Sequence, residues 1–387
     1  MFSREKIEQF KSVPTPFYYY DLNLLDATLN EISKEADAYD YKVHYALKAN
    51  SNDELLNLIS EHGLGADCVS GNEILRALDT GFESSEIAFA GVGKTDEEIN
   101  IGLEHDIFCF NCESLPEIEV INELAEKKGK VAKIALRINP NVNANTHHYI
   151  TTGLEENKFG INIWELEDVV KALENCDFIE LVGLHFHIGS QITDLSVFKS
   201  LCIRVNEIQE WFYERKIIVD HINVGGGLGV DYEHPDDNLI PDFKNYFKVF
   251  NDFLALRSGQ KVHFELGRSI VAQCGSLITK VVYVKKGMNT SFAIVDAGMT
   301  ELLRPALYQA FHKIEPLTFV SNTIKRYDVV GPICESSDCF GKSLMLPELE
   351  RNNLVVIRTT GAYGEVMANN YNLRENAAAY YERELVE

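Results

Sequence analysis

The feature that most constrains the fold of this chain is a repeated alternation of short apolar runs and longer amphipathic stretches. The runs are rich in β-branched and aromatic residues, and the stretches have helical periodicity. We expect strands at residues 43–47, 66–69, 87–90, 107–110, 133–138, 181–187, 221–224 and 262–265. We expect helices at residues 53–62, 71–79, 97–104, 116–127, 165–174, 194–214 and 242–256. Eight such units in about 225 residues have the size of a (β/α)8 TIM barrel.

A doubly wound open sheet is the competing arrangement. Polar residues suited to chemistry end several different strands, however, which is typical of barrels. After Gly267 the pattern changes to β-rich runs at 276–284, 291–295, 325–330 and 354–360. The run at 16–21 is expected to be a strand that pairs with this second region. The sequence therefore predicts an α/β fold with two domains. Residues 24–266 form a TIM barrel, and residues 267–387 together with residues 1–23 form a mainly β domain.

Composition excludes several kinds of partner. The chain has 36 Lys and Arg against 59 Asp and Glu, and its net charge of −23 disfavours nucleic acid and anionic membranes. No uncharged apolar run approaches the roughly 18 residues of a membrane span, and the N-terminus lacks an apolar signal region. Cys109 and Cys112 form a lone C-x-x-C, so neither a metal site nor a redox pair is expected. These features are typical of a cytoplasmic protein with reduced cysteines.

Two of the predicted strands are followed by an amine and by a glycine loop. Lys48 ends the first strand, where partial desolvation lowers the pKa of an amine toward the range in which it forms a Schiff base. A solvated lysine at a strand end is the alternative. Glycines 225–227 follow the seventh strand, where their backbone N–H groups can converge on a phosphate. A plain glycine turn is the alternative.

Two further strand ends carry imidazoles and a carboxylate. His185 and His187 lie two residues apart, so strand alternation puts both on the face that points into the barrel. A metal would need a third ligand, and none is evident nearby. Glu265 ends the eighth strand, where a carboxylate can keep a pyridine nitrogen protonated. Arg268 can pair with an anion or with that carboxylate. An amine, a phosphate loop, an imidazole face and a carboxylate at one end of a barrel indicate a pyridoxal phosphate site.

Seven short motifs lie between residues 16 and 372. They read YALKAN at 45–50, HFHIGSQ at 185–191, GGG at 225–227, ELGR at 265–268, LRPALY at 303–308, GPICESSD at 331–338 and GAYG at 361–364. Together they resemble the fold-type III pyridoxal-phosphate-dependent decarboxylases, most closely the members that convert meso-2,6-diaminopimelate to L-lysine and CO2. One departure is Leu266, where that family usually has proline. Leucine lacks the fixed φ of proline, but the charged residues on either side remain.

The resemblance implies a role for each residue of the site. It assigns cofactor binding to Lys48, Asp67, Arg137, His187, Ser190, Gly225, Gly226, Gly227, Glu265, Gly267, Arg268 and Tyr363. It assigns substrate binding to Arg268, Arg304, Tyr308, Glu335 and Tyr363.

Within the first set, Lys48 carries pyridoxal 5'-phosphate covalently, His187 stacks on its ring, and Asp67 and Arg137 form a supporting charged pair. Cys334 is catalytic: it is one candidate for the donor that protonates the α-carbon, and a water molecule is the other. Cys334 and Glu335 come from the partner subunit of a homodimer with shared active sites.

The choice of substrate depends on the two arginines. Arg268 and Arg304 suit a second carboxylate, which lysine and ornithine do not have. A related decarboxylase acting on carboxynorspermidine, ornithine or lysine is the runner-up. A racemase or a non-catalytic homologue is a further alternative, but a racemase needs no pocket for a distal carboxylate, and Lys48 and Cys334 are both present.

Overall fold

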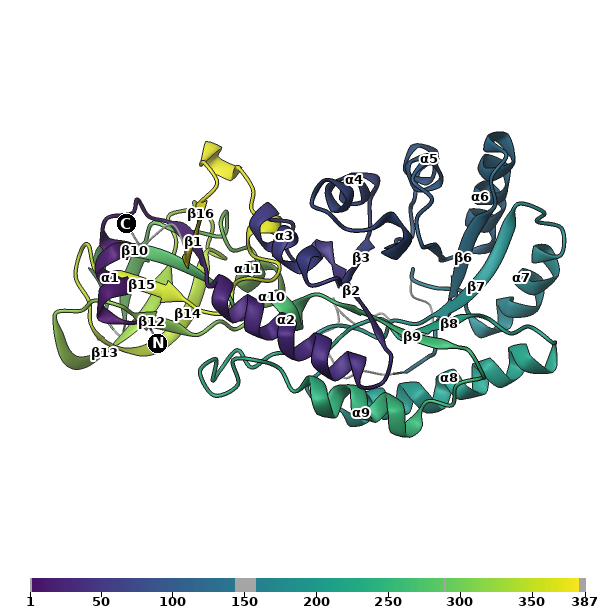
Figure 1. Cartoon of the computed structure of the whole chain (residues 1–387). Coiled ribbons are helices and arrows are strands. Elements are labelled where there is room, and N and C mark those ends of the chain that lie inside the picture. The colour runs from purple at the N-terminus through teal and green to yellow at the C-terminus, as the bar shows by residue number, and fades with distance from the viewer. Residues whose placement is uncertain (1, 143–157, 289, 383–387) are drawn as a thin grey trace. The chain divides into compact units, whose positions relative to one another are not determined.

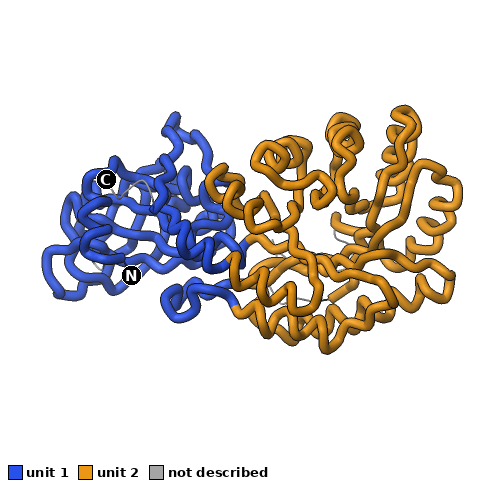
Figure 2. The backbone as a smooth tube through the Cα atoms, viewed as in Figure 1, with its two compact units in different colours: residues 1–28, 230–241, 268–387 blue, residues 29–229, 242–267 orange. Residues whose placement is uncertain are grey.

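The computed structural model describes residues 2–142, 158–288 and 290–382 (Figure 1). The chain divides into two compact units, which Figure 2 colours separately. Unit 1 comprises residues 1–28, 230–241 and 268–387, and unit 2 comprises residues 29–229 and 242–267. Across the described ranges, we find no helix with the length and apolar character that a membrane crossing requires.

Unit 2 contains a closed barrel of parallel strands, eight in the described part of the chain. In barrel order the strands are β2 (Lys42–Ala46), β3 (Gly65–Cys68), β4 (Ile87–Phe89), β5 (Cys109–Cys112), β6 (Ala132–Arg137), β7 (Ile179–His185), β8 (His221–Asn223) and β9 (Lys261–Leu266). Each pairs in parallel with its neighbours, and β2 pairs with β9 to close the ring. The predicted TIM barrel is therefore confirmed.

The helices between these strands also follow the predicted pattern. They are α3 (Asp53–Glu61), α4 (Gly71–Asp79), α5 (Asp96–Glu104), α6 (Leu115–Lys128), α7 (Leu166–Leu173), α8 (Ser196–Glu214) and α9 (Phe243–Phe253). Local capping fixes several starts: Thr95 and Glu98 form a capping box at α5, and the side chain of Ser70 accepts the backbone N–H of Glu73 at α4. The helix α2 (Leu22–Asp37), which precedes the barrel, was not predicted.

The fourth barrel strand begins two residues later than predicted. Phe108 lies before the strand, and its ring packs 4.8–5.7 Å from the imidazoles of His44, His221 and His263. The strand ladder begins at Cys109, which pairs with Ala88 of β4. The apolar character of this position reflects packing against the imidazoles, which the sequence pattern cannot distinguish from strand pairing.

Unit 1 is built on a second, mainly antiparallel sheet. Its strands are β1 (Phe17–Tyr20), β10 (Gly275–Lys286), β11 (Ser291–Val295), β12 (Ile314–Pro316), β13 (Ser321–Val330), β14 (Cys339–Glu348), β15 (Leu354–Ile357) and β16 (Ala378–Tyr381). Its helices are α1 (Arg4–Lys11), α10 (Arg268–Val271) and α11 (Arg304–Tyr308). As predicted, the N-terminal run pairs with this sheet: β1 is antiparallel to β10, with Phe17 opposite Ile278. Strands β12, β14 and β16 were not predicted.

Candidate active site

The register of the parallel strands brings polar residues to one edge of the barrel in unit 2. Asp67 pairs with Ala46 near the end of β2, and His185 pairs with both Arg137 and Asn223. These positions are at the carboxyl ends of their strands. This is the edge at which barrel enzymes carry their active sites.

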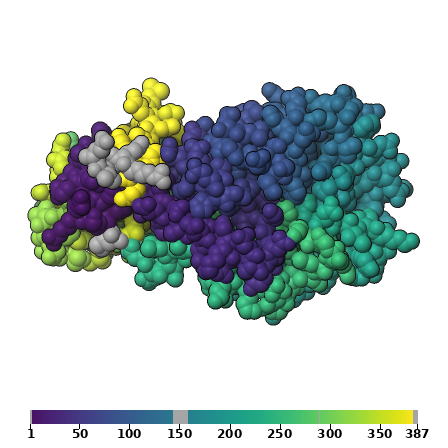
Figure 3. Space-filling model, in the orientation of Figure 1, coloured from purple at the N-terminus to yellow at the C-terminus, as the bar shows by residue number. Residues whose placement is uncertain are grey.

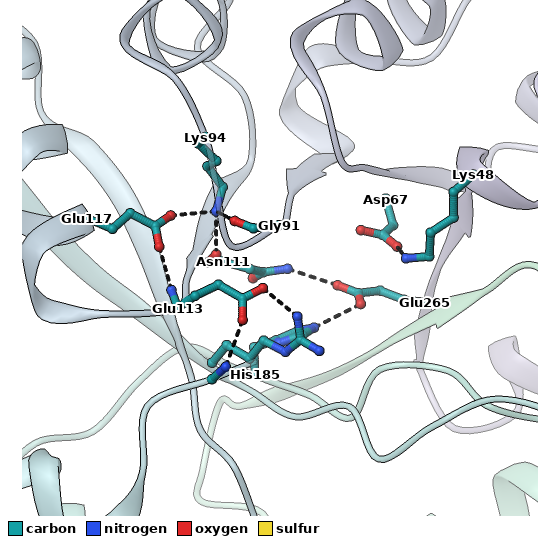
Figure 4. Close-up of polar contacts among 11 residues, drawn as sticks. Lys48, Asp67, Gly91, Lys94, Asn111, Glu113, Glu117, His185 and Glu265 are labelled. Atoms are coloured by element: carbon teal, nitrogen blue, oxygen red, sulfur yellow. Dashed lines mark hydrogen bonds and ion pairs between the residues drawn. The ribbon is translucent and has the colours of Figure 1, made fainter. Parts of the chain in front are cut away.

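Lys48 follows the first barrel strand, as predicted; it lies in a short 3-10 turn over Leu47–Ala49, because β2 ends one residue earlier than expected, at Ala46. Its Nζ donates a hydrogen bond to Oδ2 of Asp67 at 2.9 Å, and Figure 4 shows how the two side chains face each other. Asp67 is completely buried, and its Oδ1 has no hydrogen-bond partner among the described residues. Burial raises the pKa of Asp67, and so does the charge of Glu265, while Lys48 opposes both effects. The lysine is held in place, and one buried carboxylate oxygen remains available to a bound group.

Among the described residues, three side chains donate hydrogen bonds to the carboxylate of Glu265. Oε1 accepts from Nδ2 of Asn111 at 2.9 Å and from Nδ2 of Asn223 at 2.8 Å. Oε2 lies 2.8 Å from Nε2 of His185 (Figure 4). Burial by itself would raise the pKa of Glu265, but His185 and Lys48 lower it well below its ordinary value. Glu265 is therefore a stable anion, as the partner of a protonated ring nitrogen must be.

The glycine loop after β8 packs tightly against the end of β9. Gly225 has a φ of 68°, its N–H donates to Oδ1 of Asn223 at 2.9 Å, and its carbonyl accepts the N–H of Glu265 at 2.8 Å. A Cβ on Gly226 would lie 1.9 Å from the backbone oxygen of Glu265. Glycine is therefore required here by the close approach of two backbones.

The two histidines reach this edge in different ways. β7 ends at His185, so strand alternation accounts for His185 alone. His187 lies in the following loop, where its Nδ1 accepts the N–H of Gly226 at 3.3 Å. Burial lowers the pKa of His187 well below its ordinary value, and the charges of Arg137 and Lys48 lower it further. The ring is therefore neutral. Ser190 follows in the same loop and is partly buried.

The expectation that Asp67 and Arg137 form a charged pair is wrong. Asp67 pairs with Lys48, whereas Nη1 of Arg137 pairs with Oε1 of Glu113. The second oxygen of Glu113 accepts the N–H of Gly160 at 2.8 Å. The reason is topological: β3 and β6, which carry Asp67 and Arg137, are separated in the barrel by β4 and β5.

A second group of functional candidates lies within unit 1. Arg268, the first residue of α10, donates from Nη1 to the hydroxyl of Tyr232 at 2.6 Å, and its guanidinium lies 4.8 Å from the ring centre of Tyr363. Arg304 lies 5.0 Å from the ring centre of Tyr232, and its Nη1 is 2.7 Å from Nε2 of His312. Both arginines are buried, with exposed fractions of 6%. Tyr232 therefore contacts both guanidiniums.

The electrostatics of this arginine–tyrosine cluster favour an anion. Burial lowers the pKa of His312 to about 3, helped by the charge of Arg304, so its neutral ring accepts from Arg304 and donates from Nδ1 to the carbonyl of Arg358 at 2.9 Å. Burial would raise the pKa of Tyr232, but Arg268 and Arg304 lower it overall. No acidic side chain pairs with Arg304 in the described ranges. A buried cation without an acidic partner is costly unless a ligand supplies one.

Cys334 and Glu335 lie in the loop between β13 and β14, and both are exposed. Oε1 of Glu335 accepts from the hydroxyl of Tyr371 at 2.8 Å. The carboxylate of Asp338 holds the loop by accepting two backbone N–H groups at 2.7 Å, from Met299 and from Ile333. Among the described residues, neither Cys334 nor Glu335 is hydrogen-bonded to the arginine–tyrosine cluster. Tyr308 ends α11 and is partly buried.

Several residues of these sites were not found from the sequence. Asn111 and Asn223 are polar residues at strand ends, so the criterion that selected Lys48 could have found them. Tyr232 and His312 lie in segments without a local signal. No group of three or more His, Cys, Asp or Glu suited to a metal ion occurs in the part of the chain that the structure describes.

Comparison with known proteins identifies the family. The family described as "Pyridoxal-dependent decarboxylase, pyridoxal binding domain" matches residues 23–272. The chain therefore belongs to the pyridoxal-dependent decarboxylases, and pyridoxal phosphate is its cofactor. The resemblance to fold-type III decarboxylases is confirmed.

Individual relatives are similar over almost the whole chain. The diaminopimelate decarboxylase of Bacteroides thetaiotaomicron is 55% identical over 381 residues, which cover 98% of each protein. The crystal structure of diaminopimelate decarboxylase from Helicobacter pylori complexed with L-lysine has a TM-score of 0.91 at 41% identity, covering 97% of this chain and 93% of that one. The lysine/ornithine decarboxylase of Vibrio vulnificus, at 19% identity and a TM-score of 0.86 over 99% of this chain and 100% of that one, shares the fold.

Proposed function

We propose that this protein decarboxylates meso-2,6-diaminopimelate to L-lysine and CO2, the last step of lysine biosynthesis. The observation that carries the proposal is Arg304, a buried guanidinium that no acidic side chain of the described residues neutralises. A substrate with a second carboxylate supplies the missing anion, and Arg268 provides a second guanidinium beside the same tyrosine, Tyr232. The similarity to the diaminopimelate decarboxylases of Bacteroides thetaiotaomicron and Helicobacter pylori, at 55% and 41% identity, supports the same substrate.

The barrel edge fits pyridoxal phosphate. It offers an amine at Lys48, a buried oxygen on Asp67 that no described residue pairs with, a neutral imidazole at His187 and a loop at Gly226 that excludes side chains. The residues proposed to hold the cofactor are Lys48, Asp67, Arg137, His187, Ser190, Gly225, Gly226, Gly227, Glu265, Gly267, Arg268 and Tyr363. Bound pyridoxal phosphate accepts the electron pair that remains on the α-carbon of the substrate when CO2 leaves.

The residues around the cofactor have separate tasks in this proposal. Lys48 makes the covalent link through Nζ, and Asp67 orients that amine. Glu265 remains ionised and would hold a proton on the ring nitrogen, and the neutral ring of His187 would pack against the cofactor. We expect Lys48→Ala to form no covalent adduct with the cofactor after borohydride reduction. An adduct in this variant would contradict the assignment of Lys48.

The substrate residues are proposed on the same basis. Arg268, Arg304 and Tyr308 bind the distal carboxylate, Glu335 binds the distal amine, and Tyr363 borders both cofactor and substrate. We propose that Cys334, rather than a water molecule, returns a proton to the α-carbon. Glu335 already accepts a hydrogen bond from Tyr371, which keeps its carboxylate in a fixed position.

The substrate is tested by comparing kcat/KM for meso-diaminopimelate, ornithine and lysine. We expect meso-diaminopimelate to be preferred by about 100-fold or more, because the other two leave a buried guanidinium unpaired. Arg304→Met should remove most of this preference. Arg351→Met is the matched control, since Arg351 is an exposed arginine 5.2 Å from the ring centre of Tyr283. Comparable kcat/KM values for the three amino acids in the unmodified protein would contradict the proposed substrate.

We also propose that the protein is a cytoplasmic homodimer with shared active sites. Cys334 and Glu335 are exposed in a single chain, as are Tyr371 and the nearly fully exposed Leu373. The C-terminal segment, yellow in Figure 3, projects from the surface of unit 1. A second copy that covers this segment would bury apolar surface. The free cysteines of the described residues are in keeping with a reducing compartment.

Shared sites predict complementation between two inactive variants. Lys48→Ala and Cys334→Ala should each be inactive alone. Mixed under conditions that exchange subunits, they should recover about a quarter of the wild-type activity, because half of the dimers are mixed and each has one intact site. A monomer in sedimentation analysis, or no recovery despite subunit exchange, would contradict the proposal.

A further inference from the structure

Lys94 is a buried lysine that the proposed chemistry does not use. It lies in the loop between β4 and α5, and its side chain is 1% exposed. Its Nζ donates to the carbonyl of Gly91 at 2.9 Å, to the carbonyl of Asn111 at 2.8 Å and to Oε1 of Glu117 at 2.5 Å. These acceptors belong to three segments: the loop itself, β5 and α6 (Figure 4). An ammonium group has three protons, so this arrangement uses all of them.

Lys94 binds the backbone of β5 just beyond the last residue of β5 that pairs with β4. β4 pairs with β5 at Cys109 and Phe110, and the next residue on β5 is Asn111. The carbonyl of Asn111 is held by Lys94. The partner of Lys94, Glu117, uses its second oxygen to accept the N–H of Glu113 at 2.7 Å. The Lys94–Glu117 pair therefore fixes both ends of the segment 111–113.

The side chains of this segment reach two groups of the cofactor site. Nδ2 of Asn111 donates to Oε1 of Glu265 at 2.9 Å. The carboxylate of Glu113 pairs with Arg137. Figure 4 shows these contacts as a continuous path from Lys94 to Glu265 and from Lys94, through Glu117, to Glu113. A shift of this segment would therefore change the positions of Glu265 and Arg137 together.

Stability alone does not explain a buried lysine at this position. Replacing a buried ion pair by apolar side chains is often neutral or stabilising, since desolvation offsets the attraction of the charges. The pair formed by Lys127 and Glu123 on α6 has the same N–O distance of 2.5 Å, but both side chains are exposed. Of these two ion pairs, only Lys94–Glu117 contacts the backbone of β5.

We propose that Lys94 is a positioning residue for the cofactor: together with Glu117 it fixes Asn111 and Glu113, which place Glu265 and Arg137. This inference rests on the proposed assignment of Glu265 and Arg137 to the cofactor site. It does not depend on which amino acid is the substrate.

The test compares Lys94→Met with the matched control Lys127→Met. We expect the Lys94→Met apoprotein to bind pyridoxal phosphate about tenfold more weakly, because each lost contact leaves a buried acceptor without its donor. Binding is measured by quenching of protein fluorescence. The pH midpoint of the absorbance of the bound cofactor should also shift, through Glu265. Lys127→Met should change neither quantity. A Lys94→Met protein with wild-type affinity and a wild-type absorbance profile would overturn the proposal.

Two further variants separate positioning from folding. Glu117→Gln keeps an oxygen for Lys94 and removes the acceptor of the Glu113 N–H, so it should weaken cofactor binding even if Lys94→Met does not fold. Unchanged affinity in Glu117→Gln would overturn the proposal.

In the Asn111→Leu background, Lys94→Met should cause little additional shift of the absorbance midpoint, because the path to Glu265 is already broken. Fully additive shifts would refute action through Asn111. None of these measurements requires turnover, so a failure of meso-diaminopimelate as substrate leaves their outcome intact.

Discussion

Asn223→Asp tests how Glu265 is kept ionised. Nδ2 of Asn223 donates to Oε1 of Glu265 at 2.8 Å, and its Oδ1 accepts the N–H of Gly225 at 2.9 Å. An aspartate side chain has the same shape as asparagine. It therefore keeps one oxygen for the N–H of Gly225 and places its second oxygen against Oε1 of Glu265. Asn223 is fully buried and Glu265 is 6% exposed. The substitution therefore creates a buried pair of carboxylates with little other change.

The size of the effect follows from the distance. At 2.8 Å, two unit charges repel by about 6 kcal/mol at an effective dielectric constant of about 20. This energy equals about 4 pKa units, so the pair should share one proton with an apparent pKa of about 8. At pH 7 about nine pairs in ten then hold that proton. Glu265 would no longer present a full negative charge to the ring nitrogen.

The assay is the pH dependence of kcat at saturating cofactor. We expect kcat of Asn223→Asp to be about tenfold below wild type at pH 7 and to recover as the pH rises through about 8, where the pair becomes fully ionised. Stability gives a second readout. The folded-state pKa of the pair is raised above its unfolded value of about 4, so the difference in melting temperature from wild type should widen as pH rises from 4 to 8.

Asn162→Asp is the matched control for this experiment. Nδ2 of Asn162 also donates to a glutamate oxygen at 2.8 Å, on Glu165, but this contact is exposed. Solvent screens an exposed pair, so we expect wild-type activity and stability. A pH profile of Asn223→Asp that matches wild type between pH 6 and 9 would refute the reasoning about Glu265.

Three further predictions concern other parts of the structure. Burial raises the pKa of Glu73 to about 7, which is above the value of this carboxyl in the unfolded chain. The wild type should therefore lose about 3 kcal/mol of stability between pH 5 and 8, and Glu73→Gln should not. Equal changes in the urea-unfolding free energy of the two proteins across this range would contradict the prediction. Gly226→Ala should weaken cofactor binding strongly, whereas Gly93→Ala should not, because a Cβ at Gly93 meets nothing within 4 Å. Equal effects of the two substitutions in a cofactor titration would contradict this prediction. Asp338→Asn should lower kcat about tenfold without changing cofactor affinity, because the amide can accept only one of the two backbone N–H groups that hold the Cys334 loop. An unchanged kcat would count against this role of Asp338.

The strand and helix pattern of the barrel could be predicted because it is local. The apolar period of 3.6 in α3 buries Leu55, Leu56 and Ile59, and each can be read from its neighbours along the chain. The second domain was predicted less completely. β14 runs over Cys339–Glu348 with an irregular pattern of exposure and turn-forming residues inside it, and its pairing with β13 depends on a long antiparallel contact that no local period specifies.

The sequence by itself determined the barrel, the lysine after its first strand, the glycine loop and the carboxylate of Glu265, because each follows from a residue type at the end of a periodic run. Only the tertiary structure decided their partners. Asn111 and Glu265 are 154 residues apart, and the choice of Glu113 over Asp67 as the partner of Arg137 depends on strand order around the barrel. Hydrogen bonds and ion pairs act over a few ångströms in space, whatever the separation along the chain, so the electrostatics of the site appear only when the barrel is closed.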